Sequence, residues 1–382
     1  MPIYTQETTL RVAKRYNNTK RPYLLVNPLQ AKHLPVSPSE ALSMMKSLGH
    51  LLCQKYPNTK LVIGFAETAT AIGAAVATCF PDPCIYIHTT RESMPDVQNW
   101  VLFSEEHSHA VEQKLCAETL GVWFHLSDTI LFVEDEISTG KTLINMVRKL
   151  KQQFPVLSEK KLVAASILNR VSPENITKME DAGIQCEYLV KLPQVDYSEM
   201  VSHIQVSEAD PTDYIEPHLI CESLSELELY DPRKGVNTKT YTQNCLQIAQ
   251  EFCSHYTTSL PYGASVLVLG TEECMYPALI LGDYLEQSDN HLSVRCHATT
   301  RSPIGISQME GYPITSGHKI MSFYETERNT YLYNLQHYDT VIVVTDGLGT
   351  HIQAMGSFLS AIKPYHIPNL FWLQGGHHVW HI

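Results

Sequence analysis

Two carboxylates followed by a short turn rich in hydroxyls and glycine form the most chemically suggestive stretch of the sequence. Glu134 and Asp135 are adjacent, and they are followed after two residues by Ser138, Thr139, Gly140, Lys141 and Thr142. Backbone N–H groups and hydroxyls of such a turn can surround a phosphate, and the dipole of a following helix favours the negative charge. Carboxylates just before the turn suit sugar hydroxyls or the water molecules of a bound Mg²⁺. The pattern therefore predicts an anion site beside an acidic pair.

The elements around this motif must place it at the end of a strand. Residues 130–133 form an apolar, β-branched run that is typical of a buried strand ending at the acidic pair. From Leu143 onward, the spacing of Ile144, Val147 and Leu150 is helical. The sequence thus predicts a strand, an acidic pair, a turn and a helix N-terminus in direct succession.

Two further loops follow predicted strands earlier in the chain. Residues 61–64 end in a run of small and polar residues before an alanine-rich helix: Gly64, Phe65, Ala66, Glu67 and Thr68. Backbone amides there could meet an anion, although close helix–strand packing alone would also explain the small residues. Residues 84–88 form a third predicted strand, and the polar residues 89–110 after it lack periodicity, as many lid loops do. The loop includes His107 and His109, whose spacing is poor for binding a metal on a helix.

Strands and helices alternate along the first part of the chain. Further strands are predicted at residues 162–168 and 187–192, and a helix is predicted from an N-cap at Ser37 to about Tyr56. Such alternation predicts an α/β fold with a parallel sheet, in which these loops meet at the carboxyl ends of the strands. We expect a first domain at residues 1–205 with an N-terminal hood, a linker at 206–235 and a C-terminal domain at 236–382.

Composition narrows the class of protein. The chain has 382 residues, of which 44% are hydrophobic and 18% charged, so it can build sizeable cores. A net charge of −12 argues against a broad nucleic-acid surface. Residues 1–10 show no signal-peptide pattern and no apolar run is long enough to span a membrane, so we expect a cytoplasmic protein that contacts neither nucleic acid nor membrane. The ten cysteines are scattered, which favours reduced thiols over disulfides or zinc.

The C-terminal part resembles an altered copy of the first part. Residues 266–270 match 61–64 and lead into a second apolar helix, residues 294–302 echo 85–93, and residues 338–346 echo 127–135. The separation of Arg91 from Asp135 is 44 residues, and that of Arg301 from Asp346 is 45 residues. The similar order and spacing predict a second, degenerate α/β domain of similar layout.

The differences between the copies concern the chemistry-bearing positions. The second copy keeps Asp346 but has Thr345 where the first copy has Glu134, and its turn at residues 347–350 is shorter and lacks a counterpart of Lys141. One carboxylate and a trimmed turn make a weaker sugar-phosphate site. We therefore expect function in the first copy and an altered or lost ligand in the second.

The stretch from Val133 to Thr142 resembles the 5-phosphoribosyl-1-pyrophosphate (PRPP) signature of type I phosphoribosyltransferases, in which an apolar strand and two acids precede a Thr-Gly-x-Thr turn. A Walker A loop is the competing interpretation because Gly140, Lys141 and Thr142 fit its end. Its first glycine would fall at Asp135, where a carboxylate would sit against the phosphates. The resemblance implies that residues 64–68 are the pyrophosphate loop and residues 89–110 the flexible loop.

Three shorter motifs make the resemblance closer. Residues 64–69 (GFAETA), 105–110 (EEHSHA) and 300–303 (TRSP) are similar to the orotate phosphoribosyltransferase-like family of tellurite-resistance and stress gene clusters, whose C-terminal domain is named for the TRSP motif. The resemblance covers nearly the whole chain. It implies an Mg²⁺-dependent transfer of phosphoribose from PRPP to a nitrogenous base.

The resemblance also implies a role for each site residue. Ser138, Thr139, Gly140, Lys141 and Thr142 would bind the ribose 5-phosphate, and Glu134 and Asp135 would hold the ribose hydroxyls and the Mg²⁺ water shell. Pyrophosphate would be bound by Arg91 together with the backbone of Phe65, Ala66, Glu67 and Thr68. The acceptor base would lie near Lys32 and His33, which could equally form a surface turn. Ser138 replaces an aspartate that activates purines in hypoxanthine-type relatives, so an already anionic acceptor such as orotate is favoured.

Several alternatives remain open from the sequence. The fold could serve a non-catalytic PRPP-sensing or nucleotide-sensing regulatory protein, although no basic DNA-binding module is visible. The enzyme could act in the reverse direction, alongside partner enzymes of one pathway. The C-terminal half could provide a substrate-recognition or oligomerisation surface with Arg301 facing an anion, and a homo-oligomer is expected. The terminal histidines His377, His378 and His381 could suggest metal binding, but loose histidines at a chain end are the simpler interpretation.

Overall fold

The structure is a computed structural model that describes residues 2–103, 113–218, 220–224, 226–257, 260–347, 349 and 351–381. It forms two compact units. Unit 1 comprises Met1–Gln6, Leu42–Gln194 and Tyr230–Gln243, and unit 2 comprises Glu7–Ala41, Val195–Leu229 and Asn244–Ile382. His107 and His109, and with them the EEHSHA motif at 105–110, fall outside the described residues.

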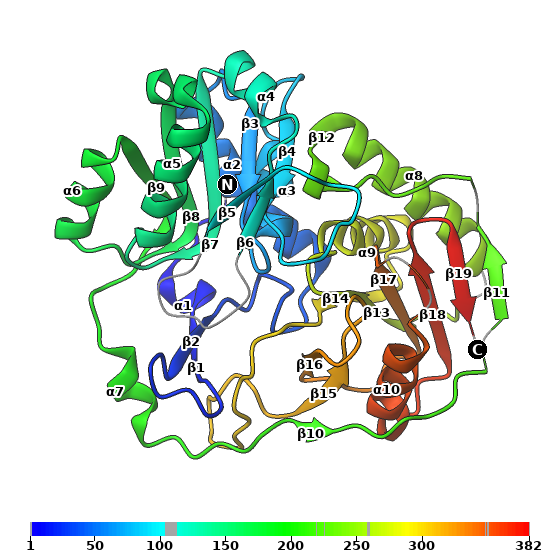
Figure 1. The fold of residues 1–382 in the computed structure, drawn as a ribbon. Helices are drawn as coiled ribbons and strands as arrows, with labels where there is room; N and C mark the ends of the chain where they lie inside the picture. Colours follow the sequence, from blue (N-terminus) through cyan, green and yellow to red (C-terminus); the bar gives the residue numbers. More distant parts are fainter. Residues whose placement is uncertain are drawn as a thin grey trace. The chain divides into compact units, whose positions relative to one another are not determined.

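Unit 1 is built on a mainly parallel sheet (Figure 1). Its described strands run in the order β12-β4-β3-β7-β8-β9, and all neighbours are parallel except β12 and β4. The strands in chain order are β3 (Leu61–Gly64), β4 (Ile85–His88), β7 (Thr129–Ile137), β8 (Lys161–Asn169), β9 (Ile184–Lys191) and β12 (Val236–Asn237). Parallel strands need crossover connections, which helices supply here. The predicted α/β fold with a parallel sheet is confirmed.

Helices of unit 1 follow from the local sequence. They are α3 (Thr70–Ala77), α4 (Leu120–Leu126), α5 (Lys141–Gln153) and α6 (Pro173–Asp181), while α2 (Pro38–Lys55) begins in unit 2 and continues into unit 1. All of α3 is buried because its small side chains let it pack closely on β3 and β4. In α5 the buried residues are Leu143, Met146, Val147 and Leu150, as the helical spacing predicts. Ser37 precedes α2 and its hydroxyl accepts from Glu40 N at 3.5 Å.

Two strands differ from the sequence-based expectation. The strand expected at residues 130–133 extends to Ile137 as β7, because residues 134–137 continue the pairing with β8. Part of the loop expected at residues 89–110 forms β5 (Trp100–Phe103), which pairs with β6 (Gln113–Cys116) in antiparallel register. Both corrections have the same cause, since backbone groups of a segment with weak local preference gain hydrogen bonds from a neighbouring strand.

Unit 2 contains a second mainly parallel sheet (Figure 1). Its described strands run in the order β11-β19-β18-β17-β13-β14, and a smaller sheet has the order β10-β15-β16. The strands of the larger sheet are β11 (Ile220–Ser223), β13 (Ser265–Gly270), β14 (Ser293–Ala298), β17 (Thr340–Thr345), β18 (Asn369–Gln374) and β19 (His378–His381). The smaller sheet contains β10 (Asp210–Pro211), β15 (Gly317–Met321) and β16 (Asn329–Tyr333).

The remaining elements of unit 2 complete its layers. A separate antiparallel pair is formed by β1 (Arg11–Lys14) and β2 (Tyr23–Val26). The helices are α1 (Gln6–Thr9), α7 (Tyr197–Ser202), α8 (Thr238–Tyr256), α9 (Tyr276–Ser288) and α10 (Ile352–Ile362), of which α1 and α8 cross the unit boundary. No helix among the described residues is long and apolar enough to cross a membrane.

The internal repeat is visible in the strand register. Four parallel strands have the order β4-β3-β7-β8 in unit 1 and β14-β13-β17-β18 in unit 2. Gly64 pairs with His88 and Val133, and the matching Gly270 pairs with Ala298 and Val344. These pairs coincide with the sequence alignment of the two copies. A second α/β domain of similar layout is therefore confirmed.

The two copies exchange short segments. Val36, which precedes α2 of the first copy, forms an antiparallel bridge with Cys296 on β14 of unit 2. Val236, which precedes α8 of the second copy, pairs in the same manner with Tyr86 on β4 of unit 1. Residues 7–41 accordingly belong to unit 2 and residues 230–243 to unit 1. The compact units thus divide the chain differently from the boundaries expected at residues 205 and 235, because each copy completes the sheet of the other.

The conformation of residues 230–243, the last segment of unit 1, depends on Gly235. Its φ of 84° lies in the region that favours glycine, and a Cβ at this position would overlap the ring of Trp123. We predict that Gly235→Ala lowers the free energy of unfolding by about 2–4 kcal/mol through backbone strain and steric overlap together. Chemical denaturation of the purified chain measures this loss.

Gly263→Ala provides the matched control for that change. Gly263 has a φ of 79°, but a Cβ there meets nothing within 4 Å, so only the backbone strain of about 1 kcal/mol should remain. Equal losses for the two variants would contradict a packing role for Gly235 against Trp123.

Candidate functional site

The predicted loops of unit 1 leave neighbouring strands of one sheet. The central strand β3 ends at Gly64, which pairs with His88 at the end of β4 on one side and with Val133 of β7 on the other. Since these strands are parallel, their three following loops begin at the same edge of the sheet (Figure 1). This carboxyl edge is where ligands bind in open α/β sheets.

The loop after β3 is held by its first two backbone amides. Phe65 N donates to Val133 O at 3.1 Å, and Ala66 N donates to Thr89 Oγ1 at 2.8 Å. Thr89 in turn donates through its own amide to Gly64 O at 2.9 Å and through its hydroxyl to Gln113 Oε1 at 2.7 Å. The peptide between Ala66 and Glu67 is cis. These bonds set the path of the predicted pyrophosphate loop before any ligand is present.

Thr89 was not among the site residues expected from the sequence. Its hydroxyl is fully buried and joins the loop after β3 to the end of β4. The repeat contained a signal for it, since Thr89 and Thr90 recur as Thr299 and Thr300 in the second copy. A pair of threonines kept in both copies indicates a structural role that does not depend on the ligand.

The acidic pair lies on a part of β7 that extends past β3. Beyond Val133 the strand continues to Ile137 and keeps its pairing with β8, where Glu134 lies opposite Ser166. Thr68 Oγ1 donates to Asp135 Oδ1 at 2.8 Å, and both side chains are half-buried. This bond joins the loop after β3 directly to the acidic pair.

The turn after β7 begins helix α5. Gly140 occupies the N-cap in a left-handed conformation with φ 73° and ψ 2°, and its carbonyl accepts from Ile144 N at 3.0 Å. A side chain at this position would overlap Met179. Thr139 Oγ1 accepts from Lys141 N at 3.4 Å. The turn thus brings hydroxyls and the amide end of a thirteen-residue helix together, which is the arrangement an anion requires.

Arg91 follows β4 in the third loop. Thr90 exchanges two backbone hydrogen bonds with Lys114 at 2.8 and 3.0 Å, and its hydroxyl accepts from Glu92 N at 2.9 Å. Arg91 lies between these fixed neighbours and is half-buried. A half-buried guanidinium offers planar paired donors to an anion.

Lys32 and His33 lie in unit 2. Lys32 is fully buried, and its ammonium donates to the carbonyl oxygens of Glu272 and Thr299 at 2.8 Å each. The interpretation of these residues as a surface turn is wrong, because His33 is also 1% exposed. Their assignment to an acceptor base stays a prediction, and the contacts of Lys32 within unit 2 give it a structural role.

The donor chemistry of the acidic pair fits a magnesium ion. Glu134 and Asp135 offer the hard carboxylate oxygens that Mg²⁺ prefers. Within the ranges that the structure describes, no group of three or more His, Cys, Asp or Glu side chains could hold a metal by itself. Magnesium usually keeps several waters and binds through one or two carboxylates plus substrate phosphates, so such a complete protein cage is not required.

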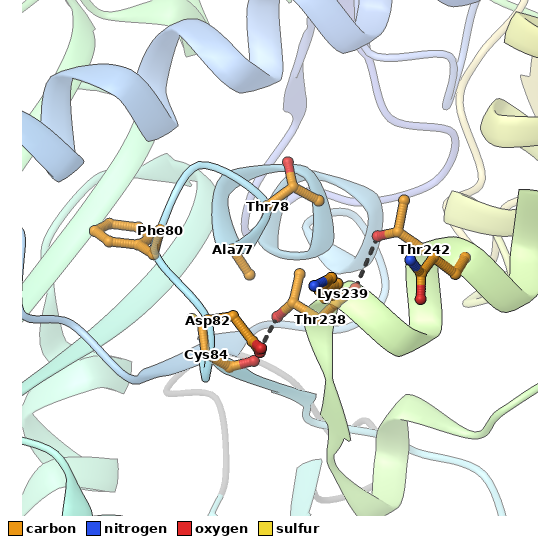
Figure 2. Close-up of a pocket in the computed structure, with 9 residues that line it drawn as sticks. Ala77, Thr78, Phe80, Asp82, Cys84, Thr238, Lys239 and Thr242 are labelled. Atoms are coloured by element: carbon orange, nitrogen blue, oxygen red, sulfur yellow. Dashed lines mark hydrogen bonds between the residues drawn. The ribbon is translucent and has the colours of Figure 1, made fainter.

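A separate cavity of unit 1 lies away from these loops. Its volume is about 340 Å³, and Figure 2 shows Ala77 and Cys84 beside Thr238 at the start of α8. Thr238 Oγ1 donates to Cys84 O at 2.9 Å, and burial raises the pKa of the Cys84 thiol to about 12. Because Cys84 precedes β4, the cavity is at the amino end of this strand, and none of the predicted site residues lines it.

Two family models match the sequence of the chain. A family model described as phosphoribosyl transferase matches residues 9–195, and a model described as the TRSP domain C-terminal to that family matches residues 231–362. A search of curated protein sequences finds no match.

Solved structures similar to the chain are phosphoribosyltransferases. Adenine phosphoribosyl transferase from Trypanosoma brucei has 14% identity over 48% of this chain and 77% of its own, with a TM-score of 0.35. Orotate phosphoribosyltransferase from Mycobacterium tuberculosis has 13% identity over 49% and 90%, with a TM-score of 0.29. Adenine phosphoribosyltransferase from Giardia lamblia has 10% identity over 48% and 94%, with a TM-score of 0.34.

The first family model spans the acidic pair and the turn before α5, and the second spans the TRSP motif at residues 300–303. The chain therefore belongs to the phosphoribosyltransferase family whose members carry a C-terminal TRSP domain.

Proposed function

We propose that unit 1 is an Mg²⁺-dependent phosphoribosyltransferase that uses PRPP and a nitrogenous base and releases pyrophosphate. The observation that carries the proposal is the hydrogen bond from Thr68 to Asp135. It brings the end of the loop after β3 against the acidic pair on β7, with the turn before α5 following directly along the chain. A sugar that carries a phosphate at one end and pyrophosphate at the other needs these three features close together.

The 5-phosphate is assigned to the turn before α5. Ser138, Thr139 and Thr142 contribute hydroxyls, and the left-handed Gly140 leaves the helix N-terminus open to the anion. Lys141 is exposed at the first helical position, where its ammonium can screen the phosphate. Glu134 and Asp135 then accept hydrogen bonds from the ribose hydroxyls that lie between the two phosphorylated ends.

Pyrophosphate is assigned to the backbone of residues 65–68 and to Arg91. As the bond between ribose C1 and the pyrophosphate oxygen breaks, the electron pair leaves with pyrophosphate and the sugar takes on oxocarbenium character. Donors already fixed in position stabilise the charge that develops on the leaving group. A nitrogen lone pair of the base then forms the new bond to C1. When magnesium is bound, it neutralises part of the pyrophosphate charge.

The acceptor is proposed to be an anionic base of the orotate type. Ser138 is a poor proton acceptor, so the turn offers no group that would deprotonate a neutral 6-oxopurine. A base whose reacting ring nitrogen is already deprotonated loses no proton in the transfer. The ten cysteines, all of them in the described part of the chain, form no disulfide, which favours a reducing compartment such as the cytoplasm.

The acidic pair provides the first test of this proposal. We predict that the double change Glu134→Gln and Asp135→Asn abolishes PRPP binding, because the ribose hydroxyls and the Mg²⁺ water shell lose their charged acceptors. Isothermal titration calorimetry with PRPP and Mg²⁺ measures the loss.

Asp128→Asn is the matched control for the acidic pair. Asp128 is exposed and lies at the opposite end of β7, so removing its charge should leave PRPP binding unchanged. Binding by the double variant that equals the wild type would sink the assignment. Binding without pyrophosphate release across a panel of bases would instead favour the alternative of a non-catalytic PRPP sensor.

The turn before α5 provides a second test. We predict that Gly140→Ala weakens PRPP binding by about tenfold or more, a loss of about 1.4 kcal/mol, because a Cβ strains the left-handed N-cap and displaces the phosphate turn. Gly121→Ala in α4 is the control, since its Cβ would meet Phe154 at an ordinary 3.6 Å. Calorimetry at matched protein stability compares the two, and unchanged affinity in Gly140→Ala would remove the turn from the phosphate site.

A further inference from the structure

The loop after β13 in unit 2 follows the same hydrogen-bonding pattern as the loop after β3 in unit 1. Thr271 N donates to Val344 O at 3.1 Å, as Phe65 N does to Val133 O. Glu272 N donates to Thr299 Oγ1 at 3.0 Å, as Ala66 N does to Thr89 Oγ1. The second unit has therefore kept the framework of an anion-binding loop.

Glu272 occupies the place in unit 2 that Ala66 occupies in unit 1. Its side chain is 1% exposed and its carboxylate accepts three charged or polar donors. Arg301 Nε lies 2.6 Å from Oε2, an Arg328 terminal nitrogen lies 3.0 Å from the same oxygen, and Ser322 Oγ donates to Oε1 at 2.5 Å. These donors come from two segments of unit 2, the loop after β14 and the connection between β15 and β16.

Each of the two guanidiniums at Glu272 also contacts a second carboxylate, since Arg328 lies 2.8 Å from Glu325 Oε2. Arg301, the arginine of the TRSP motif, also lies 3.6 Å from Glu273 Oε1. Lys32 donates to the backbone carbonyl of Glu272. Both guanidiniums are largely buried, with side chains 14% and 17% exposed. Guanidinium pairs of this kind bind phosphates and carboxylates alike, because both anions present paired oxygens.

We propose that this loop is a latent binding site for a phosphate-type anion, held closed by the carboxylate of Glu272. The internal carboxylate takes the donors that a pyrophosphate or phosphate group would otherwise use. It is tethered to the loop, so it binds at high effective concentration and loses little freedom on doing so. The proposal rests on contacts within unit 2 and does not require that unit 1 binds PRPP.

Removal of the internal carboxylate tests the inference. In Glu272→Ala, Arg301 keeps its contact with the buried carboxylate of Glu273 and Arg328 keeps the exposed carboxylate of Glu325, but both lose Glu272. Titration of the full-length variant with inorganic pyrophosphate in magnesium-free buffer should show one binding equivalent per chain more than the wild type. The added site should be at least about tenfold tighter than any binding of pyrophosphate to unit 2 in the wild type.

Glu325→Ala is the matched control. Glu325 Oε2 lies 2.8 Å from Arg328, but its side chain is 64% exposed, so the variant loses the same charge without emptying the loop. It should gain no equivalent. An added site in this control would show that net charge, not the position of Glu272, governs binding, and would overturn the proposal.

Two safeguards keep the outcome decisive. Glu272→Ser provides a second variant with a small polar side chain. Thermal unfolding with and without pyrophosphate reports binding even when a variant is unstable, because a ligand that binds the folded state raises the melting temperature. A folded variant with no added equivalent, or an unstable one that pyrophosphate does not stabilise, overturns the inference.

The number of pyrophosphate equivalents that the variant gains also distinguishes this inference from the proposed function of unit 1. A wild type that binds no pyrophosphate without magnesium and a variant that binds one equivalent would support the latent site, while the Mg²⁺-dependent site in unit 1 is tested by the PRPP calorimetry with Mg²⁺. A wild type and a variant that bind the same number of equivalents would overturn the latent site, whatever the result with PRPP.

Discussion

Both units depend on two consecutive backbone amides that tie the loop of the first strand to its neighbours. In unit 1 these are the amides of Phe65 and Ala66, which donate to a carbonyl of β7 and to a threonine hydroxyl after β4. Buried N–H groups are costly to leave without acceptors, so the loop cannot move away from this path cheaply. The remaining amides and side chains of the loop are thereby presented at the carboxyl edge of the sheet.

The two loops carry different side chains at the residue whose amide donates to the threonine hydroxyl. Ala66 leaves the loop of unit 1 without an added carboxylate, whereas Glu272 brings one into contact with two guanidiniums in unit 2. A buried ion pair is poor evidence of stability, because desolvation offsets much of the attraction. Its effect here is better described as occupation, since donors engaged by an internal carboxylate are not free for an external anion. A copy of the domain can thus keep the fold of the loop while an internal carboxylate occupies its donors.

Because short segments are exchanged between the two copies, each compact unit is made of several separate stretches of the chain. Val36 pairs with β14 of unit 2 and Val236 pairs with β4 of unit 1, so the sheet of each copy is extended by the other. Residues of the predicted hood, such as Leu24 and Val26, lie in the core of unit 2. Lys32, for example, is buried beside the backbone of Glu272 and Thr299.

The sequence by itself determined the strands, the helix spacing and the repeat, because apolar periodicity and turn chemistry are local properties. The strands at residues 61–64 and 84–88, the helix after Gly140 and the equivalence of Thr89 with Thr299 could all be inferred in this way. Tertiary structure alone decided the extension of β7 to Ile137, the burial of Lys32 and the contact of Glu272 with Arg301 and Arg328. Each depends on partners far away in the sequence, and local preference carries no information about which distant strand or side chain will supply the missing hydrogen bond or charge.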